Sequence, residues 1–182
     1  MFSQEANHHS DAELVEFIQN NQIQYFDIIV ERYSKPIYNY LLRLLYFHIQ
    51  DAEDGLSETF LKVFGSINSY NPKLKFSSWI YRIAHNQAVD MLRQKKHKTV
   101  PIEDYLEKFS FSDTFTQYQK EDLEKLLILL KGRDRNLLTL FYLEELSVTE
   151  IGAILKERPQ TISVWLHRAK TNAQNKIRNY FK

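Results

Sequence analysis

The chain has 182 residues and a nearly balanced charge, with 24 Lys and Arg residues against 23 Asp and Glu residues. A composition of 43% hydrophobic and 26% charged residues is that of a folded globular protein and excludes an intrinsically disordered chain. The absence of cysteine excludes disulfides, thiolate catalysis and cysteine-ligated zinc. No apolar run approaches the length of a membrane span and no basic-then-apolar leader opens the chain, so we expect a cytoplasmic protein without a signal peptide.

Only four glycines and four prolines punctuate the sequence, which favours helices over sheets. Apolar residues recur at helical spacing in four successive N-terminal segments. Pro36 interrupts the second segment and predicts a kink or a break there. The third begins at Asp51, and the fourth follows a loop over residues 68–75 and is expected to be capped by Ser77 or Ser78.

Periodicity weakens over residues 99–120, where acids and aromatics are mixed, and returns from about Glu121 to the end. We therefore predict an all-α protein of two small helical domains, residues 1–98 and 121–182, joined by a flexible linker over residues 99–120. The aromatics of the linker indicate that it docks on a partner.

Basic residues concentrate in two places, residues 82–98 and residues 153–182, with an acidic stretch over residues 99–130 between them. Two separated basic segments suggest two contacts with a polyanion. Charge alone leaves open the alternative that these are ordinary solvated helix faces.

The C-terminal basic segment has the pattern of a helix-turn-helix. Ser147 and Glu150 form a capping box, and Pro159 ends one helix and opens the next. In the second helix the expected outward stripe contains Gln160, Ser163 or Val164, His167, Arg168 and Thr171. This arrangement is typical of DNA recognition, although a plain packing corner gives the same pattern. His167 lacks a second ligand at useful spacing and is expected to meet solvent or phosphate instead of a metal.

The N-terminal basic segment combines charge with aromatics. Arg82, Asn86, Asp90 and Arg93 share one helical face, and Tyr70, Phe76, Trp79 and Tyr81 lie at its start. Aromatic rings can stack on unpaired bases while cations hold the phosphates, which suits a melted strand. For Phe76 and Trp79, packing in the core is the favoured alternative.

Three motifs in this order resemble the extracytoplasmic-function (ECF) group of bacterial sigma factors. They are DAEDGLSETFLKVF (residues 51–64), FSSWIYRIAHNQAVDMLRQ (residues 76–94), and LSVTEIGAIL followed by TISVWLHRAK (residues 146–155 and 161–170). The resemblance implies two helical regions, sigma regions 2 and 4, and a non-enzymatic protein without a cofactor or metal. It implies core RNA polymerase (the clamp coiled coil of the largest subunit, and the flap), promoter DNA and an anti-sigma factor as partners.

The resemblance also implies roles for individual residues. Docking on the polymerase clamp falls to Asp51, Asp54, Leu56, Glu58, Phe60 and Leu61. Capture of a −10 base and of its flanking phosphates falls to Lys62, Tyr70, Asn71, Phe76, Tyr81, Arg82, Asn86, Arg93, Lys95 and Lys96. Recognition of the −35 element falls to Arg135, Arg158, Gln160, Thr161, Ser163, Val164, His167 and Arg168, with Arg135 and Arg168 on phosphates. A flap-facing surface is implied for Leu137, Leu140 and Phe141, for which a core position is an equal alternative.

The sequence departs from the family pattern at several positions. Ser163 and Trp165 stand where relatives often have Lys or Arg, so the second helix is expected to hold phosphates less strongly. The usual glycine-containing turn is replaced by Leu155-Lys156-Glu157-Arg158, and Gly55 and Ser57 alter the docking helix.

Two other functions compete with this interpretation. An autonomous helix-turn-helix regulator accounts for residues 147–178 but leaves the acidic helix at residues 51–64 without a role. An enzyme acting on nucleic acid lacks any H-E-x-x-H motif or glycine-rich phosphate loop. The nearest metal-like cluster, Asp51, Glu53, Asp54 and Glu58, suits a docking face better.

Overall fold

The computed structural model describes residues 8–72, 74–94, 126–130 and 132–180. Within these ranges the regular structure is entirely helical, which confirms the predicted fold class. The chain divides into two compact units, Met1–Met91 and Leu92–Lys182, and each is described by itself. The predicted linker, residues 99–120, lies outside the described residues.

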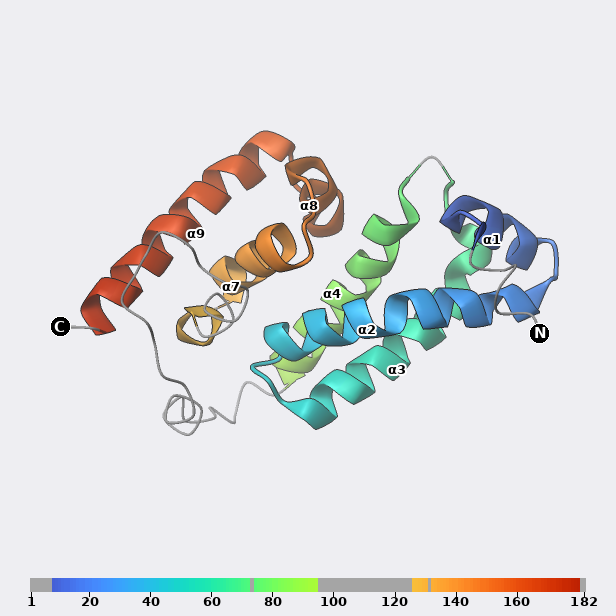
Figure 1. Cartoon of the computed structure of the whole chain (residues 1–182), viewed down its shortest axis with the longest axis horizontal. Helices are drawn as coiled ribbons and strands as arrows, with labels where there is room; N and C mark the ends of the chain where they lie inside the picture. The colour runs from blue at the N-terminus through green and yellow to red at the C-terminus, as the bar shows by residue number, and fades with distance from the viewer. Residues whose placement is uncertain (1–7, 73, 95–125, 131, 181–182) are drawn as a thin grey trace. The chain divides into compact units, whose positions relative to one another are not determined.

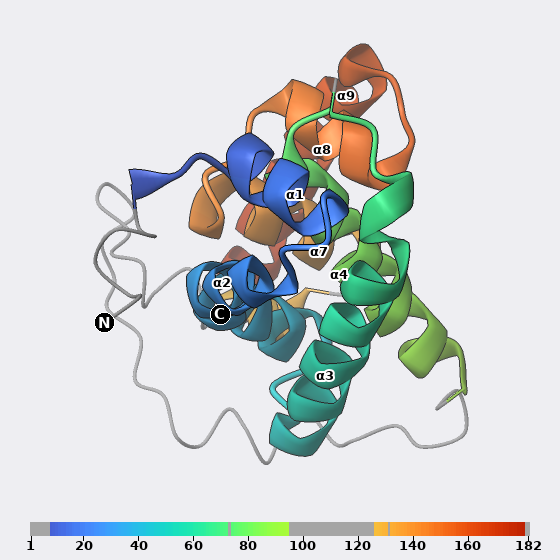
Figure 2. The same cartoon turned by 90° about the vertical axis from the view of Figure 1, so that its right-hand side faces the viewer.

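Among its described residues, the N-terminal unit contains four α-helices and two short 3₁₀ turns. They are α1 (Asp11–Gln19), η2 (Ile23–Tyr25), α2 (Phe26–Leu44), α3 (Ile49–Ser66), η3 (Ile67–Ser69) and α4 (Phe76–Gln94). Helices α2 and α3 run side by side in both views (Figures 1 and 2). The core contains Leu14, Ile29, Ile37, Leu41, Val63 and Ile80.

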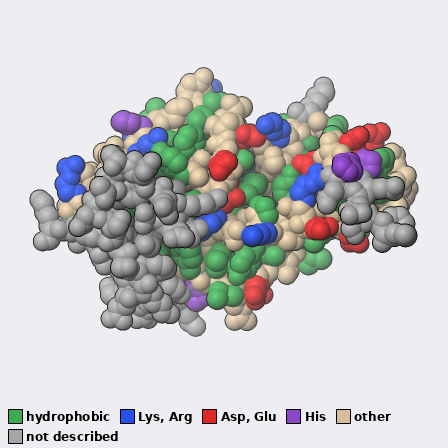
Figure 3. Space-filling model, in the orientation of Figure 1, with side chains coloured by type: hydrophobic (Ala, Val, Ile, Leu, Met, Phe, Trp, Pro, Cys, Tyr) green, Lys and Arg blue, Asp and Glu red, His purple; other side chains and the backbone are tan. Residues whose placement is uncertain are grey.

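Helix α1 begins with a capping box. The Ser10 amide donates to Glu13 Oε2 at 2.7 Å, and the Glu13 amide donates to Ser10 Oγ at 3.3 Å. The next residue, Asp11, accepts hydrogen bonds from Arg32 and from the Tyr33 hydroxyl, both on α2. Acidic and histidine side chains gather over α1 on the face in Figure 3.

Helices α2 and α3 form a tight antiparallel pair. Pro36 removes one backbone donor, and α2 nevertheless continues through it, so the break that the sequence left open does not occur. A Cβ atom on Gly55 of α3 would lie 3.4 Å from the side chains of Leu41 and Met91. Gly55 therefore lies at a close approach of α3 to both α2 and α4, where a larger side chain would have to displace its neighbours.

Helix α4 starts at Phe76, one residue before the expected serine caps, and Ser78 is buried. Ile80, Ala84 and Ala88 are fully buried, as their spacing predicts. The small alanines let α4 lie close to its neighbours while Asn86 and Arg93 remain exposed. The expected polar face of this helix thus reaches solvent.

The C-terminal unit consists of a helical turn over residues 126–129, α7 (Gly132–Leu138), a π-helical turn η4 (Thr139–Leu143), α8 (Val148–Leu155) and α9 (Pro159–Tyr180). Helix α8 begins with the predicted capping box, in which the Ser147 amide donates to Glu150 Oε2 at 2.9 Å. Helix α9 begins at Pro159, and Ile162, Leu166 and Ala169 form its buried stripe. The helix-turn-helix pattern predicted from the sequence is present (Figure 1).

The turn between α8 and α9 depends on two backbone features. Lys156 adopts the left-handed conformation, with φ 57° and ψ 42°, at the position where helices usually end with glycine. The Glu157 amide then donates to the Gly152 carbonyl at 2.9 Å. A Cβ atom on Gly152 would lie 2.7 Å from the Glu157 carbonyl oxygen, so this position requires glycine.

Candidate polymerase and nucleic-acid interfaces

One long side of α3 presents acids and apolar groups together to solvent. Asp54 and Glu58 are exposed, and Leu61, one turn further on, is 65% exposed. Their spacing places them on one face of the helix. We call Asp54, Glu58, Leu61 and Phe64 the α3 face.

Phe64 belongs to this face although the sequence analysis missed it. Its side chain is 48% exposed, and its ring lies 5.0 Å from that of Phe26 in an edge-to-face arrangement. The sequence signal that could have placed it there is its position three residues after Leu61, on the same side of the helix. An exposed Leu and Phe on one helix, rimmed by acids, form the kind of surface that binds another protein.

The other predicted docking residues are less accessible. Leu56 and Phe60 are half-buried, and Phe60 lies 6.4 Å from the ring of Phe26. Asp51 is 8% exposed, and its Oδ2 atom lies 4.0 Å from Nδ1 of His48. These three residues are therefore less accessible to a partner protein than the α3 face, which is exposed to solvent.

The polar face of α4 combines residues from two helices. Asn86, Asp90 and Arg93 are exposed, Arg82 is half-buried, and Lys62 of α3 donates a hydrogen bond to Gln87. Asn71 is exposed in the loop before α4, whereas Lys95 and Lys96 lie outside the described residues. Apart from Asp90, the side chains of this face are cations and amides, which can contact phosphates and base edges.

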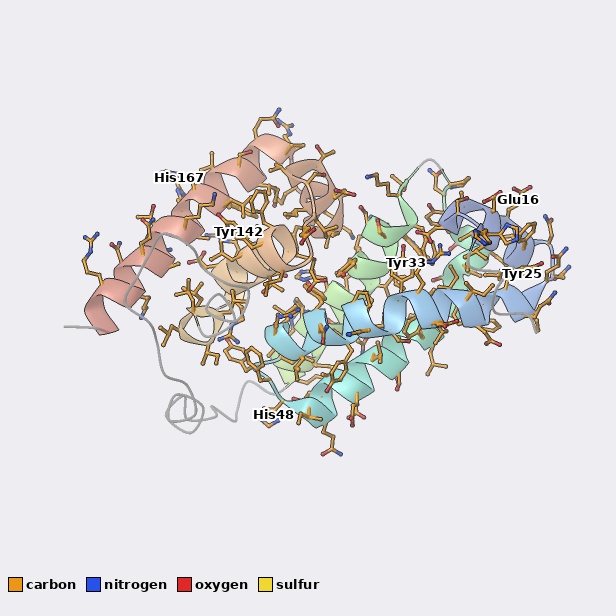
Figure 4. All side chains as sticks on the ribbon, in the orientation of Figure 1. Glu16, Tyr25, Tyr33, His48, Tyr142 and His167 are labelled. Atoms are coloured by element: carbon orange, nitrogen blue, oxygen red, sulfur yellow. The ribbon has the colours of Figure 1, made fainter. Side chains whose placement is uncertain are left out.

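The aromatic residues predicted for base stacking lie in the core instead. Tyr70 packs on Phe76 at 5.5 Å and on Trp79 at 5.2 Å, and Phe76 also packs on Tyr33, which Figure 4 shows beside α4. Burial raises the pKa of the Tyr70 hydroxyl and, with the hydrogen bond to Asp11, that of Tyr33. Close packing covers these rings, so we assign them a structural role in holding the loop before α4.

Tyr81, on the other side of α4, is also packed inside the protein. It is buried, and its ring lies 5.4 Å from that of Tyr40. The Tyr40 hydroxyl in turn lies 3.1 Å from Nδ1 of His85, and burial lowers the pKa of His85 to about 4. The imidazole is therefore neutral at neutral pH and contributes no cation to this face.

The outward stripe of α9 is open to solvent. Val164 is 50% exposed, and His167 projects from the outer side of the helix (Figure 4). The other residues of the stripe, Gln160, Ser163, Arg168 and Thr171, are exposed. Arg158, just before the helix, is also exposed, and Thr161 is half-buried. Ser163 Oγ donates to the Pro159 carbonyl at 3.1 Å, which ties this hydroxyl to the first turn of the helix.

Arg135 does not lie on this surface, which corrects its assignment as a phosphate contact. It is 1% exposed, and its guanidinium donates to the carbonyls of Leu127 (2.7 Å), Ile128 (2.9 Å) and Leu130 (2.7 Å). A cation at the carbonyl end of a helix is favoured by the helix dipole. Arg135 therefore joins α7 to the helical turn over residues 126–129.

The apolar residues considered for a flap-facing surface differ in their exposure to solvent. Leu137 and Leu140 are fully buried, so the core alternative holds for both. Phe141 is half-buried beside exposed Tyr142, and Lys170 Nζ lies 5.4 Å and 5.2 Å from their ring centroids. In Figure 4 Tyr142 lies between η4 and α9.

Within the described ranges, no group of three or more histidine or acidic side chains is arranged to hold a metal ion. Over those same residues, no helix combines the length and the apolarity needed to cross a bilayer.

Comparison with known proteins assigns both units. Residues 29–98 match the family model of sigma-70 region 2, and residues 120–172 match that of sigma-70 region 4. The chain is 29% identical to the ECF RNA polymerase sigma factor SigW of Bacillus subtilis, over 85% of this chain and 89% of SigW. It is 30% identical to the ECF RNA polymerase sigma-E factor of Haemophilus influenzae, over 92% of this chain and 95% of that protein.

A solved structure supports the fold. The sigma factor RpoE of Bartonella quintana, solved in complex with the anti-sigma factor NepR, matches with a TM-score of 0.64 at 18% identity, over 84% of this chain and 96% of that one. Two region models in the expected order, together with relatives matched over nearly their whole length, leave one assignment: the chain belongs to the ECF group of RNA polymerase sigma factors.

Proposed function

We propose that the chain binds core RNA polymerase through the α3 face and directs it to promoters whose −10 and −35 elements its two units recognise. The observation that carries this proposal is the pairing, in one ECF sigma factor, of an exposed acidic and apolar face on α3 with an exposed polar stripe on α9. A protein surface and a DNA surface on separate units suit a subunit that connects polymerase to DNA. Polymerase and promoters share the cytoplasm, which is the proposed location.

Within this function, the domain assignment remains as the sequence predicts. Residues 1–98 dock on the clamp and capture the opened −10 strand, residues 99–120 connect, and residues 121–182 bind the −35 duplex. For the −10 strand the exposed or half-exposed candidates are Lys62, Asn71, Arg82, Asn86 and Arg93. For the −35 duplex they are Arg158, Gln160, Thr161, Ser163, Val164, His167 and Arg168.

An anti-sigma factor is a further proposed partner. RpoE of Bartonella quintana, which shares the fold, was solved with one. The autonomous regulator is not favoured, because it gives no role to the exposed Leu61 and Phe64 beside Asp54 and Glu58.

The test is transcription in vitro with core RNA polymerase and a library of genomic fragments, with and without this chain. We expect a limited set of start sites that depend on the chain and share two upstream elements. The same start sites without the chain, or none with it, would refute the proposal. A chain that bound single duplex sites tightly without polymerase would support the autonomous regulator.

A further inference from the structure

Helix α9 carries little positive charge of its own where it would approach DNA. From Pro159 to Ala169 its one Arg or Lys is Arg168, and the preceding turn adds Arg158. These two residues are about 15 Å apart along the helix axis at 1.5 Å per residue. Between them, on the same side by helical spacing, stands Trp165, which is half-buried.

A cation from another helix occupies this gap. Arg133 near the start of α7 is exposed, and its guanidinium carbon lies 4.5 Å from the centroid of the Trp165 ring. The ring face attracts the guanidinium and limits its positions. A stacked guanidinium keeps the N–H groups at its edges available to a phosphate.

A second contact between the same two helices holds this arrangement. Asn172 Nδ2 of α9 donates to Asp134 Oδ2 of α7 at 2.7 Å, two turns beyond Trp165. The Asp134 carboxylate is thereby engaged with Asn172. Arg133 forms no ion pair with a carboxylate in the described part of the chain.

We propose that Arg133 is a phosphate contact of the DNA-binding unit and that Trp165 is its positioning residue. Arg158, Arg133 and Arg168 then form a row of three guanidinium groups along one side of α9, the middle one supplied by α7. The expected ligand is a backbone phosphate of duplex DNA, so the contact is independent of base sequence. This inference rests on the proposed function, in which α9 lies against the −35 duplex.

The test measures binding of the holoenzyme to a fluorescein-labelled duplex bearing a promoter recovered by the transcription experiment, by anisotropy at several KCl concentrations. For Arg133→Ala we expect several-fold weaker binding, and a slope of log affinity against log salt that is shallower by about 0.9, as for one lost phosphate contact. Arg178→Ala, which removes an exposed arginine in the last turn of α9, serves as the charge-matched control and should keep the slope.

Two variants of Trp165 separate positioning from packing. Trp165→Phe keeps a ring face and should behave like the wild type, whereas Trp165→Ala should lose most of the Arg133 contribution. The double variant Arg133→Ala, Trp165→Arg returns a guanidinium from α9 itself and should restore the slope. Thermal unfolding of each variant checks that the unit remains folded.

An unchanged affinity and slope in Arg133→Ala would overturn the proposal. Weaker binding at an unchanged slope would also overturn it, because that result indicates packing or a protein contact instead of a phosphate. A wild-type holoenzyme that fails to bind the duplex would refute the proposed function itself, and this outcome is distinct from a failure confined to Arg133.

Discussion

Lys156 shows how one residue defines the turn of the DNA-binding unit. Its left-handed conformation is disfavoured for a residue with a Cβ atom by about 1–2 kcal/mol, and glycine removes that penalty. We therefore expect Lys156→Gly to stabilise the C-terminal unit by roughly 1 kcal/mol in denaturant unfolding. Lys156→Ala keeps the Cβ atom and is the control; if it stabilised the unit as much as glycine does, the backbone explanation would be wrong.

His85 makes the stability of the N-terminal unit depend on pH. Its pKa is about 4 in the folded chain, against 6.5 for an unburied histidine. Between these values the unfolded chain binds a proton that the folded chain does not, so the free energy of unfolding decreases as pH falls. The expected loss from pH 7 to pH 5 is about 2 kcal/mol.

This pH dependence can be checked in two ways. NMR titration of the His85 ring should give a midpoint near 4 in the folded protein. His85→Gln should reduce the difference in stability between pH 7 and pH 5. A ring that titrates near 6.5 in the folded protein would contradict the assigned burial.

At the scale of the element, the proposal assigns the contact with polymerase to α3. Reversing charge at Asp54 and Glu58 together, to Lys, should weaken binding to core polymerase by at least about tenfold, because two attractive contacts become repulsive. Leu61→Ala with Phe64→Ala should weaken it similarly by removing exposed apolar anchors. Binding is measured by anisotropy with labelled sigma factor.

Helix α2 offers a matched control for these changes. Asp27 and Glu31 are both exposed and have the same spacing of four residues as Asp54 and Glu58. Reversing their charges to Lys should leave polymerase affinity within about twofold, because exposed charges outside the α3 face contribute little to docking. Equal losses from both pairs would show that overall charge, and not the α3 face, governs docking.

The helices themselves were largely predictable from periodicity and capping. The α8–α9 turn followed from Ser147, Glu150 and Pro159, since each acts on its own backbone neighbours. The Ser10 and Glu13 capping box of α1 has the same local signature, although the sequence analysis did not predict it. Pro36 does not break α2, which has buried residues on both sides of the proline, Tyr33 and Ile37, although one backbone hydrogen bond is lost.

The candidate site was less predictable, because burial depends on contacts distant in sequence. Arg135 looks like a surface cation until α7 packs beside residues 126–130 and their carbonyls surround its guanidinium. From the sequence, Tyr70 and Phe76 could stack on bases, but in the folded chain they pack against Trp79 and Tyr33. The contact of Arg133 could not be predicted from the sequence, since its partner Trp165 lies 32 residues further along the chain.

At the scale of the whole molecule, the proposed function joins two tasks on one polymerase subunit. In that proposal the exposed amides and cations of one unit meet an opened strand, and the exposed helix of the other meets an intact duplex. Belonging to the ECF sigma factors, it is an initiation subunit and not an enzyme, as the missing catalytic motifs predicted. The two tasks should therefore be separable by mutation.

The most direct test of this division follows strand opening by 2-aminopurine fluorescence in the −10 element, alongside promoter binding by the same holoenzyme. Asn86→Ala should keep closed-complex affinity within about twofold and reduce opening by about tenfold or more, because extruding a base costs a few kcal/mol that contacts such as that of Asn86 must offset. Gln160→Ala with His167→Ala should weaken binding and leave the opening rate of bound complexes unchanged. If Asn86→Ala reduced binding and opening equally, the division of labour between the two units would be contradicted.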